Sequence, residues 1–145
     1  MTTRPTTVSC ELHLRLVVPG ATPLPVRAGL RYDVVDPYAV QVAFHTGSAG
    51  DVVEWTFARS LLGDGLTRVS GEGDVRVWPS SAAQVDPVVS LSLSSPSGRA
   101  LFEVPARALG EFLTRTYEAV PLGTETDHVD LDGELALLLW AEPET

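Results

Sequence analysis

The sequence has one cysteine, no lysine and no long apolar run, and each shortage excludes a class of protein. A single cysteine, Cys10, cannot form a disulfide within the chain, so the fold does not depend on disulfide cross-links. No stretch is long and apolar enough to cross a bilayer as a helix, and residues 1–13 lack the apolar centre of a signal peptide. We therefore expect a cytoplasmic protein without membrane insertion.

Positive charge comes from arginine alone, and no arginine lies after Arg115. The net charge is −9, and eight of the 19 acidic residues fall within residues 116–145, which leaves 11 acidic residues against 10 arginines before them. The body is therefore nearly neutral and the tail is strongly acidic. Nonspecific nucleic-acid binding depends on clustered cations, so this balance disfavours it, although a local basic groove stays possible.

Residues 87–120 are the stretch around which the rest of the chain is organised. Residues 89–94 and 99–104 alternate apolar and polar side chains, the period of a strand, and the Ser-Pro-Ser-Gly turn between them predicts a hairpin. Apolar residues then recur every three or four positions up to residue 120, which predicts a helix with Pro105 in its first turn.

The same alternation predicts five further strands, at residues 8–18, 26–33, 38–45, 52–57 and 74–78. A short helix at 58–66 follows the fourth strand, weakened by Gly63 and Gly65. The chain of 145 residues therefore reads as one domain over residues 1–145, with a mobile polar lead at 1–6. We predict an α+β fold, a mostly antiparallel sheet built from two halves in which strands precede a helix.

The end of the chain predicts a C-terminal helix at residues 131–140. Its apolar side chains lie nearly all round the helix, so the helix must be buried against something. Burial between subunits is one possibility, and burial against the body of the same chain is the other. The candidate oligomer-interface residues are Leu135, Leu138, Leu139 and Trp140.

No motif predicts catalysis, a cofactor or a metal ion. The three histidines are scattered without metal-ligand spacing. Residues 130–133 resemble part of a calcium loop, but the anchoring carboxylates of an EF-hand are missing, so helix capping by Asp130 is favoured. The tryptophans more often anchor cores or interfaces than stack on bases; they are Trp55, Trp78 and Trp140.

The segment after the long helix is predicted to carry a partner-binding surface. Residues 120–123, Val-Pro-Leu-Gly, fit a type I turn with proline second and glycine fourth. Proline restricts φ and glycine permits unusual values, so the turn decides where the acidic side chains after it point. The candidate partner-binding residues are Pro121, Gly123, Glu125 and Asp127. The alternative is an ordinary connecting loop.

Several long runs of sequence resemble one known family. They include TTVSCELHLRLVVPG at 6–20, AGLRYDVVDPYAVQVAFHTG at 28–47, VEWTFARSLL at 53–62, GDVRVWPS at 73–80, LSSPSGRALFEVPARALGEFL at 93–113 and VPLGTETDHVDLDGEL at 120–135. These runs are similar to the SsgA-like proteins of sporulating actinomycetes. The similarity covers nearly the whole chain, with divergence at the N-terminus, in residues 80–86 and after residue 135.

This resemblance implies a non-enzymatic protein of sporulation-specific cell division that acts at the division septum. It implies that the protein marks future septa and recruits the tubulin-like protein FtsZ, with an SsgA-type paralogue as a further partner. It also implies a fold like that of the whirly single-strand nucleic-acid binders, assembled as a homotrimer. Because of that fold, a single-stranded nucleic-acid-binding module is the alternative function.

Overall fold

The computed structural model describes residues 6–46, 50–80 and 86–125, which form seven strands and two helices. The first half comprises four strands and a helix: β1 (Thr7–Leu16), β2 (Leu24–Asp33), β3 (Ala39–His45), β4 (Val52–Ala58) and α1 (Arg59–Asp64). The second half comprises three strands and a helix: β5 (Val75–Pro79), β6 (Val88–Ser95), β7 (Gly98–Pro105) and α2 (Ala106–Ala119). The prediction of two halves in which strands precede a helix is therefore confirmed.

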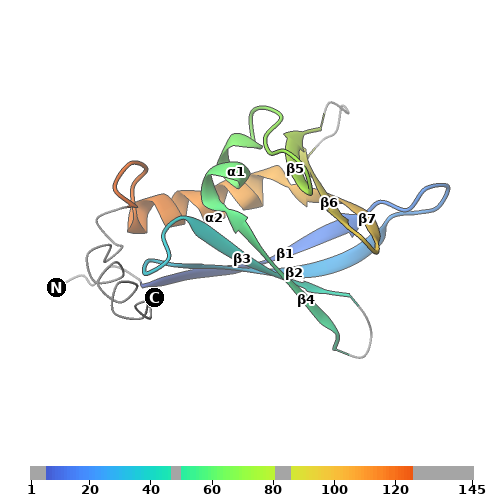
Figure 1. The fold of residues 1–145 in the computed structure, drawn as a ribbon, viewed down its shortest axis with the longest axis horizontal. Coiled ribbons are helices and arrows are strands. Elements are labelled where there is room, and N and C mark those ends of the chain that lie inside the picture. Colours follow the sequence, from blue (N-terminus) through green and yellow to red (C-terminus); the bar gives the residue numbers. More distant parts are fainter. Residues whose placement is uncertain (1–5, 47–49, 81–85, 126–145) are drawn as a thin grey trace, which may run out of the picture.

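All seven strands belong to one antiparallel sheet in the order β4-β3-β2-β1-β7-β6-β5, which curves as a half-barrel around the two helices (Figure 1). Each half is a meander of neighbours in sequence, and the two meanders meet where β1 pairs with β7. That junction is short, since only Arg15 with Glu103 and Leu16 with Phe102 face each other in register. The ring of Phe102 stacks on that of Phe44 at 4.9 Å, which ties the two meanders together through side chains.

The core lies between the sheet and the helices and follows the alternation of the sequence. In β1, Leu12 and Leu14 are buried, while the residues that alternate with them are exposed: Glu11, His13 and Arg15. Every strand contributes apolar side chains to this one face, as expected for an antiparallel sheet with one covered side. Helix α2 covers the face with a buried stripe at helical spacing: Leu109, Phe112, Leu113, Thr116 and Ala119.

Element boundaries differ from the predictions by one or two residues. Strand β1 ends at Leu16 instead of Val18, although the Val17 N–H still donates to the Leu101 carbonyl at 2.8 Å. The placement of Pro105 in the first turn of the helix was wrong. Its ψ of 117° is extended, so it ends β7 and precedes the helix as the N-cap residue. Thr6, predicted to lie in the mobile lead, accepts a hydrogen bond from Val34 at 3.0 Å.

Helix α1 is as short as its glycines predicted, ending at Asp64, and those glycines also permit close packing. A Cβ atom added at Gly65 would overlap the side chain of Val77, and one added at Gly63 would lie 2.5 Å from the hydroxyl oxygen of Tyr117. The glycines therefore let α1 approach β5 and α2 closely. Within the described residues, no helix is long and apolar enough to span a membrane.

Candidate functional site

The most unusual side chain of the described structure is Arg59, a charged residue with only 1% of its surface exposed. It is the first residue of α1, and its backbone N–H donates to the Tyr38 carbonyl at 2.7 Å. Leu62, three residues on, shares its buried face, so helical spacing turns Arg59 toward the protein interior. A buried guanidinium is costly unless its charge and its N–H groups find partners.

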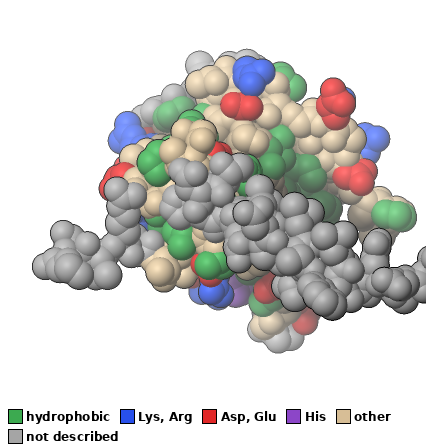
Figure 2. Space-filling model, turned by 60° about the vertical axis from the view of Figure 1, so that its left-hand side comes forward, with side chains coloured by type: hydrophobic (Ala, Val, Ile, Leu, Met, Phe, Trp, Pro, Cys, Tyr) green, Lys and Arg blue, Asp and Glu red, His purple; other side chains and the backbone are tan. Residues whose placement is uncertain are grey.

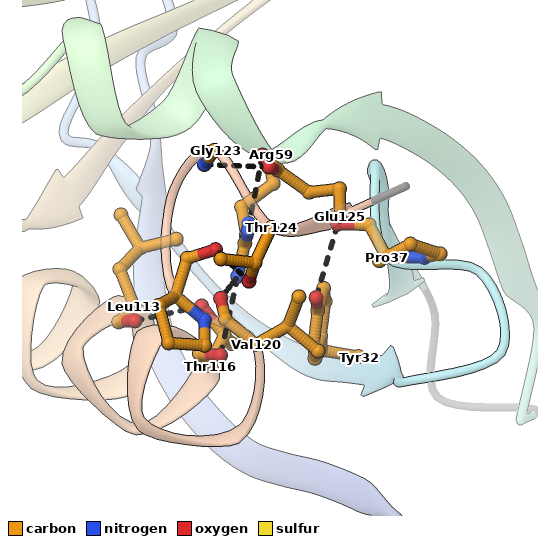
Figure 3. Close-up of polar contacts among 10 residues, drawn as sticks. Tyr32, Pro37, Arg59, Leu113, Thr116, Val120, Gly123, Thr124 and Glu125 are labelled. Carbon is orange, nitrogen blue, oxygen red and sulfur yellow. Dashed lines mark hydrogen bonds and ion pairs between the residues drawn. The ribbon is translucent and has the colours of Figure 1, made fainter. Parts of the chain in front are cut away.

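The carbonyl groups at the end of α2 supply two of those partners. Nη1 of Arg59 donates to the Thr116 carbonyl at 3.1 Å and to the Val120 carbonyl at 2.7 Å (Figure 3). The last carbonyls of a helix lack partners within the helix, and the helix dipole places negative partial charge there. Arg59 therefore caps α2 from the neighbouring helix, although the two residues joined by the shorter bond are 61 positions apart.

Two aromatic rings also contact the guanidinium. The Cζ atom of Arg59 lies 5.0 Å from the ring centroid of Tyr32 and 4.9 Å from that of Tyr117. Both distances suit cation–π attraction, which is stronger away from water. Burial raises the pKa of Tyr32 to about 12 against the opposing effect of Arg59, so this hydroxyl stays protonated. It donates a hydrogen bond to the Pro37 carbonyl at 3.0 Å.

Glu125 supplies the opposite charge. Its Oε2 lies 3.3 Å from Nη2 of Arg59, and its side chain is only 15% exposed. Nη2 makes no hydrogen bond within the described residues, so its contact with Glu125 is an ion pair. Oε1 of Glu125 accepts the Gly123 N–H at 2.7 Å. The carboxylate thus links the buried arginine to the turn that follows α2, as Figure 3 shows.

That turn has a different register from the one predicted. The Thr124 N–H donates to the Pro121 carbonyl at 3.1 Å, so the turn spans residues 121–124 and not 120–123. Gly123 occupies its third position with φ of +87°, the value that a type II turn requires there. The prediction of a type I turn was therefore wrong, because the ability of glycine to adopt positive φ moves it to the third position. The Thr124 hydroxyl also donates to the Pro121 carbonyl, at 2.7 Å.

We call this arrangement the Arg59 corner: Arg59, Tyr32, Tyr117, Gly123 and Glu125. It holds no catalytic set of nucleophile, base and orienting group, and within residues 6–46, 50–80 and 86–125 no three side chains could hold a metal ion. The corner has a structural role: it fixes the direction in which the chain leaves the end of α2.

Comparison with known proteins shows the family to which the chain belongs. The family model described as "Streptomyces sporulation and cell division protein, SsgA" matches residues 26–125, a span that contains the whole Arg59 corner. The chain belongs to the SsgA family. A relative from Frankia casuarinae, named sporulation-specific cell division protein SsgB, is 58% identical over 144 residues, which is 99% of each chain. A relative of the same name from Streptomyces coelicolor is 63% identical over 134 residues, covering 92% of this chain and 96% of the relative.

Two solved structures share the fold of this SsgA-family protein. A crystal structure of an SsgA-like sporulation-specific cell division protein from Thermobifida fusca superposes with a TM-score of 0.82 at 48% identity, covering 94% of this chain and 98% of the other. A second structure comes from work on mutations in SsgB that correlate to longitudinal cell division during sporulation of Streptomyces coelicolor. It gives a TM-score of 0.81 at 60% identity, covering 88% and 99%.

The predicted site residues of this SsgA-family protein fall into two groups. Gly123 and Glu125 belong to the Arg59 corner, and Pro121 is the first residue of the turn that contains Gly123. Asp127 lies outside the described residues, as does the predicted C-terminal helix with its candidate oligomer-interface residues Leu135, Leu138, Leu139 and Trp140. Those predictions are therefore still predictions. Trp55 packs against the core, as predicted for an anchor, with its ring 6.0 Å from that of Phe57.

Sequence analysis missed Arg59, Tyr32 and Tyr117. Residues 58–61 and 106–109 have similar sequences, Ala-Arg-Ser-Leu and Ala-Arg-Ala-Leu, but Arg107 is exposed. This similarity therefore did not indicate that Arg59 is buried. One usable signal was the spacing of Arg59 and Leu62, which puts the arginine on the apolar face of α1. An arginine on such a face needs a carboxylate nearby, and the sequence does not reveal which one.

Stability should depend on pH through Glu125. The pKa of this carboxyl lies below its ordinary value, and the largest cause is the backbone N–H of Glu125 itself. The Gly123 N–H and Arg59 lower it further, against the opposing effect of burial. Because the pKa of Glu125 is lower in the folded state, its carboxylate stabilises the fold fully above the pKa of the unfolded chain. This stabilisation is lost as the pH falls through the pKa of the folded state.

Urea unfolding of wild type and Glu125→Gln across pH should show a stability difference near neutral pH that disappears in acid. A difference that does not change with pH would contradict this assignment.

Proposed function

We propose that this protein is a non-enzymatic, sporulation-specific cell-division protein that acts in the cytoplasm at the division septum, where it marks septum sites and recruits FtsZ. Its homologues are named sporulation-specific cell division proteins, which supports a role in cell division. The observation that carries the proposal is 63% identity with SsgB of Streptomyces coelicolor over 92% of the chain. If a fluorescent fusion of the protein does not concentrate at sporulation septa, the proposed action at the septum is contradicted.

The Arg59 corner supports placing the partner-binding surface after α2. Leu122, at the tip of the turn, is an apolar side chain with 62% of its surface exposed, and Pro121 beside it is also exposed. Exposed apolar residues on a rigid turn suit a protein contact. Glu125 is held by Arg59 and Gly123, so the corner fixes where the acidic residues of the tail begin. We place FtsZ recruitment on this surface, formed by Pro121, Gly123, Glu125 and Asp127.

Co-sedimentation with FtsZ polymers tests this placement. Wild-type protein should appear in the pellet with FtsZ, and the variant Asp127→Lys should appear there far less, because a charge of the proposed surface is reversed while the ion pair between Arg59 and Glu125 is kept. The matched control is Asp51→Lys, which makes the same change in net charge at an exposed residue of the β3–β4 hairpin. Equal loss in both variants would mean that only overall charge matters. No pelleting of wild type would refute recruitment itself.

We also propose that the protein assembles as a homotrimer and interacts with an SsgA-type paralogue. The apolar residues of segment 131–140 need cover, and a subunit interface would provide it. Light scattering of the full chain at micromolar concentration should give three times the monomer mass of 15.5 kDa. A monomer would contradict burial of Leu135, Leu138, Leu139 and Trp140 between subunits and would favour burial within one chain.

A whirly-like fold and single-stranded nucleic-acid binding form the second candidate. The two strand-then-helix halves on one antiparallel sheet favour it. On the face shown in Figure 2, acidic and basic side chains are interspersed, which does not suit a polyanion. Fluorescence anisotropy with labelled oligonucleotides decides between the two candidates. Binding that weakens steeply with salt would support this second function. If no oligonucleotide binds, the role in cell division is the only one of the two candidates that remains.

A further inference from the structure

The outer face of the second meander carries an open cavity of about 530 Å³. Its side chains alternate with core residues such as Val77 and Leu91, so they lie on the face of the sheet opposite α2. Arg76 faces Ser92 across the β5–β6 pair, and Arg99 faces Ser94 across the β6–β7 pair. The full lining consists of Val69, Gly73, Arg76, Trp78, Ser92, Ser94 and Arg99.

The two arginines of this cavity have no carboxylate partner among the described residues. Five other described arginines form ion pairs with acidic side chains, and Arg115 donates to the Ser9 carbonyl at 2.6 Å. That leaves three described arginines without such a contact: Arg76, Arg99 and Arg107. Two of the three line one cavity, which is unexpected in a chain with a net charge of −9. The cavity therefore holds two guanidinium groups that have no carboxylate contact among the described residues.

The chemistry of the lining defines what would fit. A guanidinium group binds a carboxylate through two parallel hydrogen bonds, and serine hydroxyls can add further ones. Trp78 is half-buried beside Arg76, and Val69 is 67% exposed, so the same cavity offers apolar surface. A ligand that matches both features carries carboxylates next to a large apolar side chain. Peptides rich in aspartate and glutamate that contain one such residue have this pattern.

We propose that this cavity, the Arg76–Arg99 site, binds an acidic peptide segment of a partner protein. Nucleic acid fits less well, because a strand needs a continuous basic track and this site offers two arginines within an acidic protein. Strands β5, β6 and β7 contribute no residue to the Arg59 corner, and Figure 1 shows them at the opposite end of the molecule from the end of α2. The proposal therefore does not rest on FtsZ recruitment at the corner.

The test uses the full chain and an array of fluorescein-labelled peptides that combine several aspartates or glutamates with one leucine, phenylalanine or tryptophan. Parallel arrays replace the acids with asparagine and glutamine, and oligothymidylate serves as the nucleic-acid probe. We expect acidic peptides to bind wild type and the amide peptides to bind at least about tenfold more weakly, since hydrogen bonds between charged groups are the strong ones. Arg76→Gln and Arg99→Gln should each weaken binding by roughly tenfold. Both side chains are exposed, so the fold should be unaffected.

Arg107→Gln is the matched control, because it removes an exposed arginine without a described acidic partner at a different place on the molecule. It should bind the acidic peptides like wild type. The proposal is overturned if no acidic peptide binds, if the amide peptides bind equally well, or if Arg107→Gln weakens binding as much as the variants of the site. It is also overturned, in favour of a nucleic-acid site, if oligothymidylate alone binds and the Arg76 and Arg99 variants abolish that binding.

Discussion

Replacing Arg59 with alanine should lower the free energy of unfolding by about 3 to 5 kcal/mol, the range found when one partner of a buried ion pair is removed. The substitution leaves the carboxylate of Glu125 without its cation and frees the Thr116 and Val120 carbonyls at the end of α2. It also creates a cavity between the rings of Tyr32 and Tyr117. Urea unfolding followed by circular dichroism measures the change, at one protein concentration because oligomerisation shifts apparent stability.

The matched control is Arg107→Ala, which removes the corresponding arginine of the second half. Arg107 is exposed, so its loss should change the unfolding free energy by less than about 0.5 kcal/mol. If Arg59→Ala has an effect as small as that of Arg107→Ala, then Arg59 is not the residue that holds the corner together. Arg59→Lys should recover little of the lost stability. An ammonium group lacks the planar face with which the guanidinium contacts the two rings, and it cannot at the same time reach both carbonyls.

The substitution Gly123→Val should leave the body folded but prevent recruitment of FtsZ. A β-branched residue at φ of +87° is strained by about 1 to 3 kcal/mol, so the turn will change its conformation. The Gly123 N–H then no longer meets Glu125 at 2.7 Å, and the chain after α2 leaves in a different direction. Circular dichroism should remain normal, whereas co-sedimentation with FtsZ should fall toward the level seen without this protein.

Gly20→Val provides a close control for backbone strain. Gly20 has φ of +72°, and a Cβ atom there meets nothing within 4 Å, as at Gly123, but it lies in the loop between β1 and β2. It should suffer similar strain and still recruit FtsZ. If Gly123→Val folds and recruits normally, the turn is only a connector. If Gly123→Val unfolds, charge reversal of Asp127 tests the same surface and keeps the contacts of Glu125 with Arg59 and Gly123.

Local patterns in the sequence were enough to predict the strands, the two helices and the antiparallel α+β class. Strand alternation and helical spacing are properties of neighbouring residues, and burial of one face converts them directly into structure. The alternation in residues 89–94 and 99–104 therefore predicted β6 and β7 to within a residue or two. The conformational freedom of Gly123 was also expected from the sequence, because positive φ is a local property of glycine, although the turn lies one residue further along than expected.

Only the tertiary structure decided how the two meanders join and what surrounds Arg59. The β1–β7 junction pairs Leu16 with Phe102, residues far apart in sequence, and no local pattern specifies that register. Arg59 and Arg107 occupy similar sequence contexts, yet one is buried and the other exposed, because only α1 packs against the end of α2. The charge of a buried arginine is balanced by whichever groups the fold brings near it. The sequence contains Glu125 and both tyrosines, but their convergence on one guanidinium is a property of the packed chain.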